Sequence, residues 1–278
     1  MKQKRVLTIQ DYSCLGRCSL TVALPTISAA GIEAVGLPTS VLSNHTVFPS
    51  WTCVDTLHSL KEAPSKWEGR NISFDAIYTG YLSTSQVEIA LDFIHRYKTR
   101  SNLLFVDPAF ADEGKLYAGF SLAHVEAMKR LLKEADMAKP NVTEACFLTD
   151  TPYPGEAPSE EFLNGLLAKF AALGPKKIVL SGIRKEGRIG CMVYEDGEIA
   201  SFDEPARRSA HGTGDLFSSA LLSAYLLGSP LLESAHIAAL YVGNALSYNE
   251  EDGVDGKIYG PEFEKAIPAY LKNLGILK

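Results

Sequence analysis

The sequence lacks features that would place it in several common classes of protein. No apolar run approaches the roughly 18 to 20 residues that a bilayer-spanning helix needs. The five cysteines are odd in number and scattered along 278 residues, a length that can build a core without disulfides, so we expect reduced thiols. A net charge of −6 gives no electrostatic reason to expect nucleic acid as a partner. We therefore expect a protein that acts on small molecules, with neither nucleic acid nor a membrane as a partner.

The N-terminal residues and two cysteines carry weaker signals. The segment Met-Lys-Gln-Lys-Arg leads directly into the short apolar run from Val6 to Ile9, which is too short for a secretory signal. Together with the cysteine usage, this predicts a cytoplasmic protein. Cys14 and Cys18 have no matching second pair, which disfavours a zinc site and favours buried thiols.

The familiar signatures of nucleotide and hydrolytic chemistry are also missing. Gly114-Lys115 and Gly256-Lys257 are followed by Leu and Ile, so the Walker pattern G-x-x-x-x-G-K-[ST] fails. Phe217 stands where a G-x-G-x-x-G motif needs its last glycine. No G-x-S-x-G or H-E-x-x-H occurs. These absences argue against a P-loop NTPase, a dehydrogenase, an α/β-hydrolase or a zincin.

Short β-branched runs alternate with longer helical patterns along the whole chain. Strands are predicted at 5–10, 33–41, 76–80, 103–107, 177–181, 189–194 and 199–202, and helices at 20–30, 54–60, 86–97, 122–134, 160–173, 213–227, 232–248 and 262–274. Apolar strands separated by helices indicate a parallel sheet with helices on both faces. Asp196-Gly197 between two strands predicts an antiparallel edge hairpin. We expect residues 1–278 to form one α/β domain.

Ligands of such sheets collect beyond the carboxyl ends of the strands, and one glycine-rich segment stands out there. Gly212-Thr213-Gly214-Asp215, the GTGD segment, opens an apolar helix. Glycines allow close approach of a ligand, and the first N–H groups of a helix attract anions. The alternative is an ordinary helix start, since Asp is common in a first turn.

Two further segments carry carboxylates at predicted strand ends. Asn141 with Glu144 can form a capping box, or it can present an amide and a carboxylate to hydrated Mg²⁺. Asp107 ends a predicted strand, where a carboxylate is more often functional than not.

Together these segments resemble the ribokinase superfamily and, within it, the pyridoxal/pyridoxamine kinases. The GTGD segment resembles the anion-hole and catalytic-base motif of that superfamily, and Pro140-Asn141-x-x-Glu144 is similar to its N-x-x-E motif. The stretch Leu-Ser-Asn-His-Thr-Val-Phe-Pro-Ser-Trp that ends at Trp51 resembles the S-N-H-T-x-[YF]-x-x-W segment of the vitamin B6 kinases. Gly-Tyr-Leu at 80–82, Val-Asp-Pro at 106–108 and a flap-like segment at 112–117 follow in the family's order.

The resemblance implies a ribokinase-like fold and an ATP-dependent kinase of pyridoxal phosphate salvage. Such an enzyme phosphorylates the 5′-hydroxymethyl group of pyridoxal, pyridoxamine or pyridoxine with Mg²⁺ as cofactor. It further implies a homodimer, and whether a monovalent cation such as K⁺ is required stays open. Asp215 is the implied base, with an ordinary carboxyl pKa near 4. The other implied roles are phosphoryl binding by Gly212, Thr213 and Gly214; substrate binding by Asp11, Thr46, Tyr81 and Asp215; nucleotide binding by Asp107, Asn141, Glu144, Ser181, Arg184, Gly212 and Gly214; and metal binding by Asp107 and Glu144.

The sequence departs from the family at two places. Asp11 stands where these kinases usually have Ser, so it either reaches the pyridine ring and alters selectivity or caps a turn. Ala210-His211 replace the Cys that precedes the motif in some kinases that act on both pyridoxal and hydroxymethylpyrimidine. His45 is expected to order its loop, and His211 to be exposed. The alternatives are a hydroxymethylpyrimidine kinase of thiamine synthesis, a sugar or nucleoside kinase, or a non-catalytic B6-binding protein.

Overall fold

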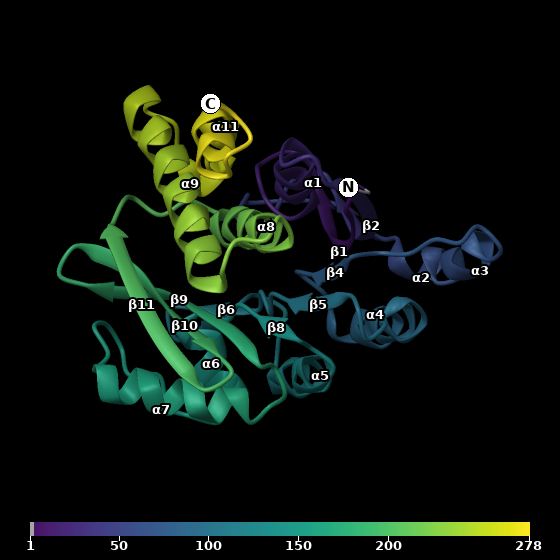
Figure 1. Cartoon of the computed structure of the whole chain (residues 1–278), viewed down its shortest axis with the longest axis horizontal. Coiled ribbons are helices and arrows are strands. Elements are labelled where there is room, and N and C mark those ends of the chain that lie inside the picture. The colour runs from purple at the N-terminus through teal and green to yellow at the C-terminus, as the bar shows by residue number, and fades with distance from the viewer. Residues whose placement is uncertain (1–2) are drawn as a thin grey trace.

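The computed structural model describes residues 3–278 and is built around one nine-stranded sheet (Figure 1). The strands are β1 (Arg5–Ser13), β2 (Glu33–Leu42), β3 (Cys53–Asp55), β4 (Ala76–Thr79), β5 (Leu103–Val106), β8 (Met137–Ala138), β9 (Lys177–Lys185), β10 (Arg188–Glu195) and β11 (Glu198–Pro205). Their order across the sheet is β11-β10-β9-β8-β5-β4-β1-β2-β3.

The middle of the sheet is parallel and both edges are antiparallel. Strands β2, β1, β4, β5, β8 and β9 pair in parallel, as the apolar strand pattern predicts. At one edge β10 and β11 form the predicted hairpin, with Asp196 (φ 49°) and Gly197 (φ 101°) in its two-residue turn. At the other edge β3 pairs antiparallel with β2, which the sequence did not predict.

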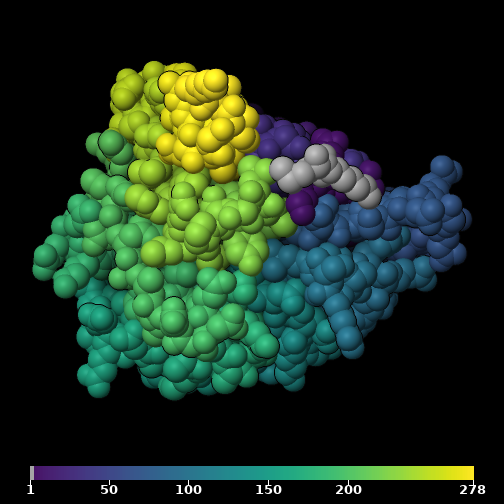
Figure 2. All heavy atoms as spheres, viewed as in Figure 1, coloured from purple at the N-terminus to yellow at the C-terminus, as the bar shows by residue number. Residues whose placement is uncertain are grey.

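Helices cover both faces of the sheet. The helices are α1 (Leu20–Ala29), α2 (Leu57–Leu60), α3 (Ala63–Trp67), α4 (Thr84–Tyr97), α5 (Leu122–Lys133), α6 (Val142–Leu148), α7 (Glu160–Ala171), α8 (Thr213–Leu226), α9 (Leu231–Asp252), α10 (Gly256–Tyr259) and α11 (Phe263–Asn273). Figure 1 shows α1, α8, α9 and α11 on one face and α4 to α7 on the other. The C-terminal helix α11 packs on α9 (Figure 2). The predicted fold is confirmed.

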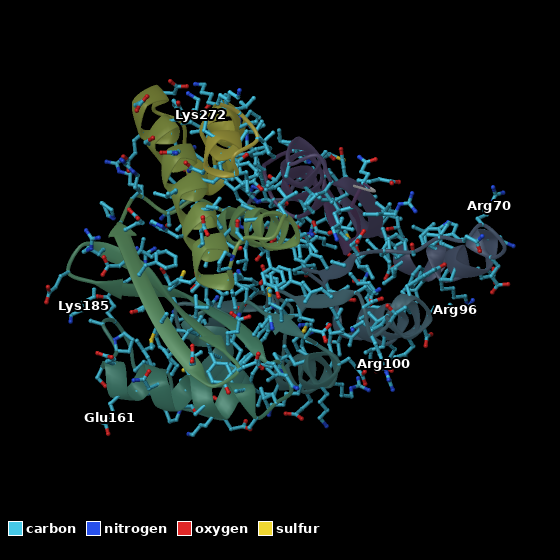
Figure 3. The ribbon with its side chains drawn as sticks, in the orientation of Figure 1. Arg70, Arg96, Arg100, Glu161, Lys185 and Lys272 are labelled. Carbon is cyan, nitrogen blue, oxygen red and sulfur yellow. The ribbon has the colours of Figure 1, made fainter. Side chains whose placement is uncertain are left out.

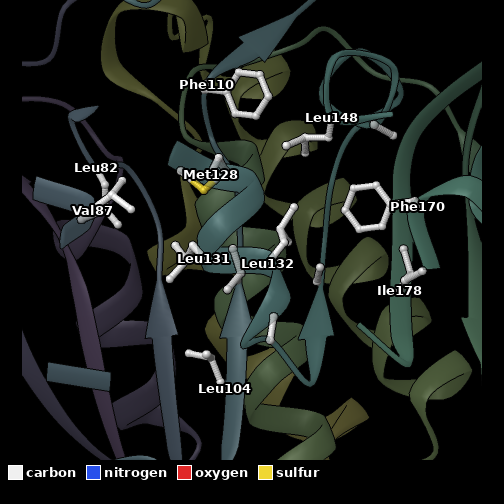
Figure 4. Close-up of a cluster of buried hydrophobic side chains, with 14 of the residues drawn as sticks. Leu82, Val87, Leu104, Phe110, Met128, Leu131, Leu132, Leu148, Phe170 and Ile178 are labelled. Carbon is white, nitrogen blue, oxygen red and sulfur yellow. The ribbon is translucent and has the colours of Figure 1, made fainter. Parts of the chain in front are cut away.

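Each face of the sheet has its own hydrophobic core. The cluster beneath α4 to α7 contains Leu104 together with Met128, Leu131 and Phe170 (Figure 4). Phe105, the next residue along β5, belongs to the opposite cluster beneath α1, α8, α9 and α11. Successive side chains of a strand point to opposite faces, so a strand with no polar alternation serves two cores.

One predicted helix is wrong in its first half. Residues 54–60 were expected to be helical, but Cys53–Asp55 forms β3, and helix α2 begins at Leu57. Val54 pairs with Val41 of β2, where its β-branched side chain suits an extended backbone. The short elements α3, α6, α10, β8 and the β6 (Ala111–Asp112) and β7 (Lys115–Leu116) ribbon were not assigned from the sequence because they span too few residues to show a period.

Parallel pairing brings several chain segments to one edge. Asp11 lies near the carboxyl end of β1, and the carboxyl ends of β4, β5 and β8 lead into Tyr81, Asp107 and Lys139 respectively. Within residues 3–278, no helix is both long and apolar enough to cross a membrane.

Candidate active site

The GTGD segment forms the N-terminus of the 14-residue helix α8. Gly212 is the N-cap residue and has a left-handed backbone conformation with φ 83°. A Cβ on Gly212 would lie 2.0 Å from the main-chain oxygen of Arg17, so the position excludes every other residue type. Gly214 is exposed, which leaves the first N–H groups of α8 open to a ligand. The geometry of this turn is therefore compatible with binding an anion.

Asp215 lies in the first turn of α8 and is held from the other end of the chain. Its Oδ2 accepts a 2.8 Å hydrogen bond from the main-chain N–H of Ser19. Burial, followed by the charge of Asp107, raises the pKa of Asp215 to about 7. The expectation of an ordinary pKa near 4 is therefore wrong, because that expectation ignored the neighbouring carboxylates.

Asp11 lies at an irregularity of β1, where the register with β2 shifts between Gln10 and Tyr12. Such bulges redirect a side chain, and they are common beside active sites. The carboxylate is buried and accepts hydrogen bonds from Ser19 Oγ at 2.5 Å and Ser13 Oγ at 3.0 Å. Asp11 is thus joined through Ser19 to Asp215, and its contact with a substrate ring stays a prediction.

Asp107 follows β5 and is almost completely buried. Its Oδ2 accepts a 2.6 Å hydrogen bond from Ser218 Oγ of α8 and lies 3.0 Å from the Nζ of Lys139. Lys139 was not among the predicted site residues, although it directly precedes Pro140-Asn141. Its position after a two-residue strand gave no periodic signal that it would face the site.

Asn141 and Glu144 form the capping box of α6. Asn141 Oδ1 accepts from Glu144 N at 2.8 Å, and Glu144 Oε2 accepts from Asn141 N at 2.9 Å. Glu144 Oε1 accepts from Phe110 N at 3.0 Å. Burial and the charge of Asp107 raise the pKa of Glu144 all the same. The capping-box interpretation is confirmed, and the interpretation as a Mg²⁺ ligand stays a prediction.

The carboxylates at this edge have an excess of negative charge that suits a hydrated cation. Asp107 and Asp11 both raise the pKa of Asp215, and Lys139 is the cation that opposes them. Within residues 3–278 no group of three or more His, Cys, Asp or Glu could enclose a metal ion. Mg²⁺ retains water and binds through one or two carboxylates and substrate phosphates. Asp107 and Glu144 fit that mode of binding.

A short two-stranded ribbon lies beside the segment that carries Glu144, and we call it the flap. It is the β6–β7 ribbon, which the sequence analysis expected at 112–117. Gly114 N donates to Thr143 Oγ1 at 3.0 Å, and the side chain of Asn141 donates to Ala111 O at 2.7 Å. The flap is thereby tied to the segment that carries Glu144.

The loop from Ser43 to Trp51 contacts the residue that precedes the GTGD turn through two imidazole rings tilted by 32°. The rings of His45 and His211 lie 4.2 Å apart, centroid to centroid. His45 Nε2 lies 2.8 Å from Ile258 O, a carbonyl that only accepts, and His45 Nδ1 accepts from Val47 N at 3.3 Å. His45 is therefore a neutral residue that orders its loop, as expected. His211 was expected to be exposed, but it is half-buried, and burial and His45 lower its pKa to about 4.

The remaining predicted site residues differ in how far they are buried. Tyr81 is half-buried, and burial followed by the charge of Asp11 raises its pKa. Ser181 forms an isolated parallel bridge with Asn141. Thr46 and Arg184 are exposed, Thr46 in the loop and Arg184 on β9. Cys18 is buried, as expected of both thiols, whereas Cys14 is exposed.

Comparison with known proteins shows similarity to phosphomethylpyrimidine kinases and to pyridoxal kinases. Residues 24–261 match the phosphomethylpyrimidine kinase family. A Bacteroides thetaiotaomicron protein, assigned to the phosphomethylpyrimidine kinases and solved in a crystal form with pyridoxal, is 30% identical; the alignment covers 97% of this chain and 96% of that one, with a TM-score of 0.90. Pyridoxal kinase from Lactobacillus plantarum is 28% identical, with 97% of both chains covered and a TM-score of 0.88. The chloroplastic thiamine biosynthetic bifunctional enzyme of Arabidopsis thaliana is 28% identical over 94% of this chain, which spans half of that enzyme's length.

Proposed function

Because the chain belongs to the phosphomethylpyrimidine kinase family of the ribokinase-like superfamily, we propose that it transfers the γ-phosphoryl group of ATP to the 5′-hydroxymethyl group of a B6 vitamer. One observation carries the proposal: a carboxylate with a raised pKa, Asp215, lies in the first turn of a helix whose N-terminus is open to an anion. The carboxylate can accept the proton of the attacking hydroxyl group, and the N–H groups of the turn can bind the phosphoryl group that is transferred.

Asp215 accepts the proton of the vitamer's hydroxyl group in this proposal. The hydrogen bond from Ser19 N orients the carboxylate, and its raised pKa makes it a stronger base than an exposed Asp. The N–H groups of the GTGD turn stabilise the charge that develops on the transferring phosphoryl group. Asp107 and Glu144 would hold Mg²⁺, which would supply further positive charge to the phosphates.

The vitamer and the nucleotide occupy neighbouring parts of the sheet edge. Asp11, Tyr81 and Thr46 bind the vitamer, and Asp11 accepts a hydrogen bond from the pyridinium N–H or the phenolic 3-OH. Asp11 is buried within hydrogen-bond reach of Ser19, the residue that orients Asp215, which supports this placement. The nucleotide phosphates lie against the GTGD turn and the segment made of Asp107, Asn141, Glu144, Ser181 and Arg184.

A second candidate substrate is hydroxymethylpyrimidine. The family's description and the Arabidopsis thiamine enzyme favour it. The L. plantarum pyridoxal kinase and the S-N-H-T segment favour the B6 vitamers. Both substrates carry a hydroxymethyl group on an aromatic ring, so the base and the anion site serve either one, and the ring-binding residues decide between them.

An assay of ADP release and product mass tests the proposal with ATP and Mg²⁺. Pyridoxal, pyridoxamine, pyridoxine and hydroxymethylpyrimidine are compared at equal concentrations, with Asp215→Ala as the inactive control. We expect 5′-phosphorylated vitamers to be the main products. A strong preference for the pyrimidine would overturn the choice of substrate. Binding of a vitamer without turnover would support a carrier protein instead.

The proposal extends to the protein's state in the cell. We propose that residues 1–278 act as one domain, that two copies form a homodimer, and that the enzyme is cytoplasmic and requires Mg²⁺. Sedimentation equilibrium tests the dimer. Omitting Mg²⁺, or replacing K⁺ with Na⁺ at saturating MgATP, tests the cations.

A further inference from the structure

Lys139 is a lysine in an unusual place. Arg96, Lys185 and Lys272 point outward at the periphery of the molecule (Figure 3). Lys139, in contrast, is only 5% exposed. Its main-chain N–H donates to Val106 O at 3.0 Å, which extends the β5–β8 pairing and fixes Lys139 beside Asp107. Burying an ammonium is costly unless it is paired or has a functional use.

The ammonium of Lys139 lies between a strand end and the start of α8. Its Nζ is 3.0 Å from Asp107 Oδ2 on one side. On the other side, Nζ lies 3.4 Å from the point that a Cβ on Gly214 would occupy. The absence of a side chain at Gly214 therefore leaves the ammonium directly against the turn that receives the anion.

The ion pair with Asp107 uses only part of the hydrogen-bonding capacity of the Lys139 ammonium. An ammonium has three N–H donors, and within residues 3–278 one carboxylate, that of Asp107, lies within ion-pair distance of Nζ. The ion pair therefore leaves two of the three donors of Lys139 for a ligand.

We propose that Lys139 is a catalytic residue whose ammonium contacts the phosphoryl group during transfer, together with the N–H groups of the GTGD turn. The proposal rests on the phosphotransferase activity proposed above. In that step the alcohol oxygen bonds to the γ-phosphorus, the bond from phosphorus to the ADP oxygen breaks, and the alcohol proton passes to Asp215. Lys139 keeps its protons and offsets the charge on the phosphoryl oxygens.

Steady-state kinetics of Lys139→Met test the role in turnover. Removing one donor to a developing charge lowers kcat by about 100- to 1000-fold, so we expect a loss of that size, with KM for the vitamer within about threefold. Lys139→Arg, which keeps the charge, should recover at least a tenth of the wild-type kcat. The matched control is Lys129→Met, which removes a lysine paired with Asp150 and Glu126 on the surface of α5 and should leave kcat unchanged. A Lys139→Met variant with wild-type kcat would overturn the proposal.

A binding measurement separates contact with the phosphoryl group from a structural role. MgADP alone and MgADP with aluminium fluoride, which mimics the transferring group, are titrated calorimetrically in the presence of pyridoxine. Since a transition-state contact favours the mimic over the ground state, Lys139→Met should weaken the fluoride complex at least tenfold more than MgADP. Equal weakening of both complexes would mean that Lys139 only neutralises Asp107, and would overturn the proposal.

Gly214→Ala provides a second variant that leaves Lys139 in the sequence. Gly214 has an ordinary negative φ, and the new methyl group would meet only Lys139 Nζ, at 3.4 Å. We expect the same selective loss of the fluoride complex, and this variant decides the question if Lys139→Met does not fold. A wild-type enzyme that forms the fluoride complex but phosphorylates no vitamer would refute the proposed substrate. In that case, selective weakening by Lys139→Met would still support the role of Lys139.

Discussion

The main-chain N–H of Ser19 donates a 2.8 Å hydrogen bond to Asp215, a residue 196 positions further along the chain. The Oγ of Ser19 donates to Asp11. One residue thus joins the carboxylate proposed to bind the vitamer to the carboxylate proposed to accept its proton. Ser19 has φ 48°, a conformation that costs about 1 kcal/mol or more for a residue other than glycine. The strain is located at the junction of the two proposed functions.

Replacement of Asp215 by alanine removes the proposed base. General-base catalysis contributes about 100- to 10,000-fold, so kcat should fall within that range while calorimetry still detects vitamer binding. Asp215→Asn keeps an oxygen that can accept from Ser19 N and controls for loss of the hydrogen bond. Turnover by either variant at the wild-type rate would rule out Asp215 as the base.

The pH dependence of turnover reports the raised pKa of Asp215. The base works only when ionised, so kcat/KM of the free enzyme should fall as the pH drops below about 7. The same acid limb should appear with pyridoxal and pyridoxine, which assigns it to the protein. An acid limb near pH 4 in the free enzyme would contradict this prediction.

The same carboxyl group should destabilise the fold at neutral pH. Because its pKa is raised in the folded state, the folded protein binds the extra proton between about pH 4 and pH 7, and the unfolding free energy falls as the pH rises through that range. Asp215→Asn should therefore be more stable than wild type at pH 8, by on the order of 1–2 kcal/mol. Urea denaturation at pH 8 and pH 4 checks it, since the difference should vanish at pH 4.

Much of the fold could be predicted from the sequence because its cause is local. The run that became β5 is apolar without alternation, and that pattern indicates a strand covered on both faces. Asp196-Gly197 specifies its hairpin turn by backbone conformation alone. Strand β3 could not be predicted, because its pairing with β2 depends on a partner distant in the chain and three residues show no period.

The site was predictable in its parts but not in its electrostatics. The GTGD and N-x-x-E segments are contiguous, so their chemistry can be recognised in the sequence. The pKa of Asp215 depends on Asp107, and the charge of Lys139 depends on both Asp107 and Glu144. Those neighbours come together only when the parallel strands align their carboxyl ends.

Asp11 should control which ring the enzyme accepts. Burial raises its pKa, and two serine hydroxyl groups hold its carboxylate in place. Asp11→Asn keeps the shape but exchanges an acceptor oxygen for a donor, so KM for a vitamer with a pyridinium N–H should rise about 10- to 100-fold, since a charged hydrogen bond contributes about 1.5–3 kcal/mol. Values of kcat within about threefold of wild type would separate binding from chemistry. Unchanged KM for all three vitamers would place Asp11 outside the substrate pocket.

Gly212 and Gly31 make a matched pair that isolates the packing of the anion turn. Both have a positive φ, 83° and 78°, so an alanine at either position pays a similar backbone cost of about 1–2 kcal/mol. A Cβ at Gly31 meets nothing within 4 Å, whereas at Gly212 it would lie 2.0 Å from Arg17 O, a main-chain atom that cannot rotate away. Gly212→Ala should therefore lose at least about 2 kcal/mol more than Gly31→Ala in urea denaturation. It should also lose turnover, because relieving the clash moves the start of α8 away from Arg17 and weakens the hydrogen bond between Ser19 and Asp215. Equal stability of the two variants would mean that the turn adapts, and that its close packing against residues 17–19 does not hold the base in place.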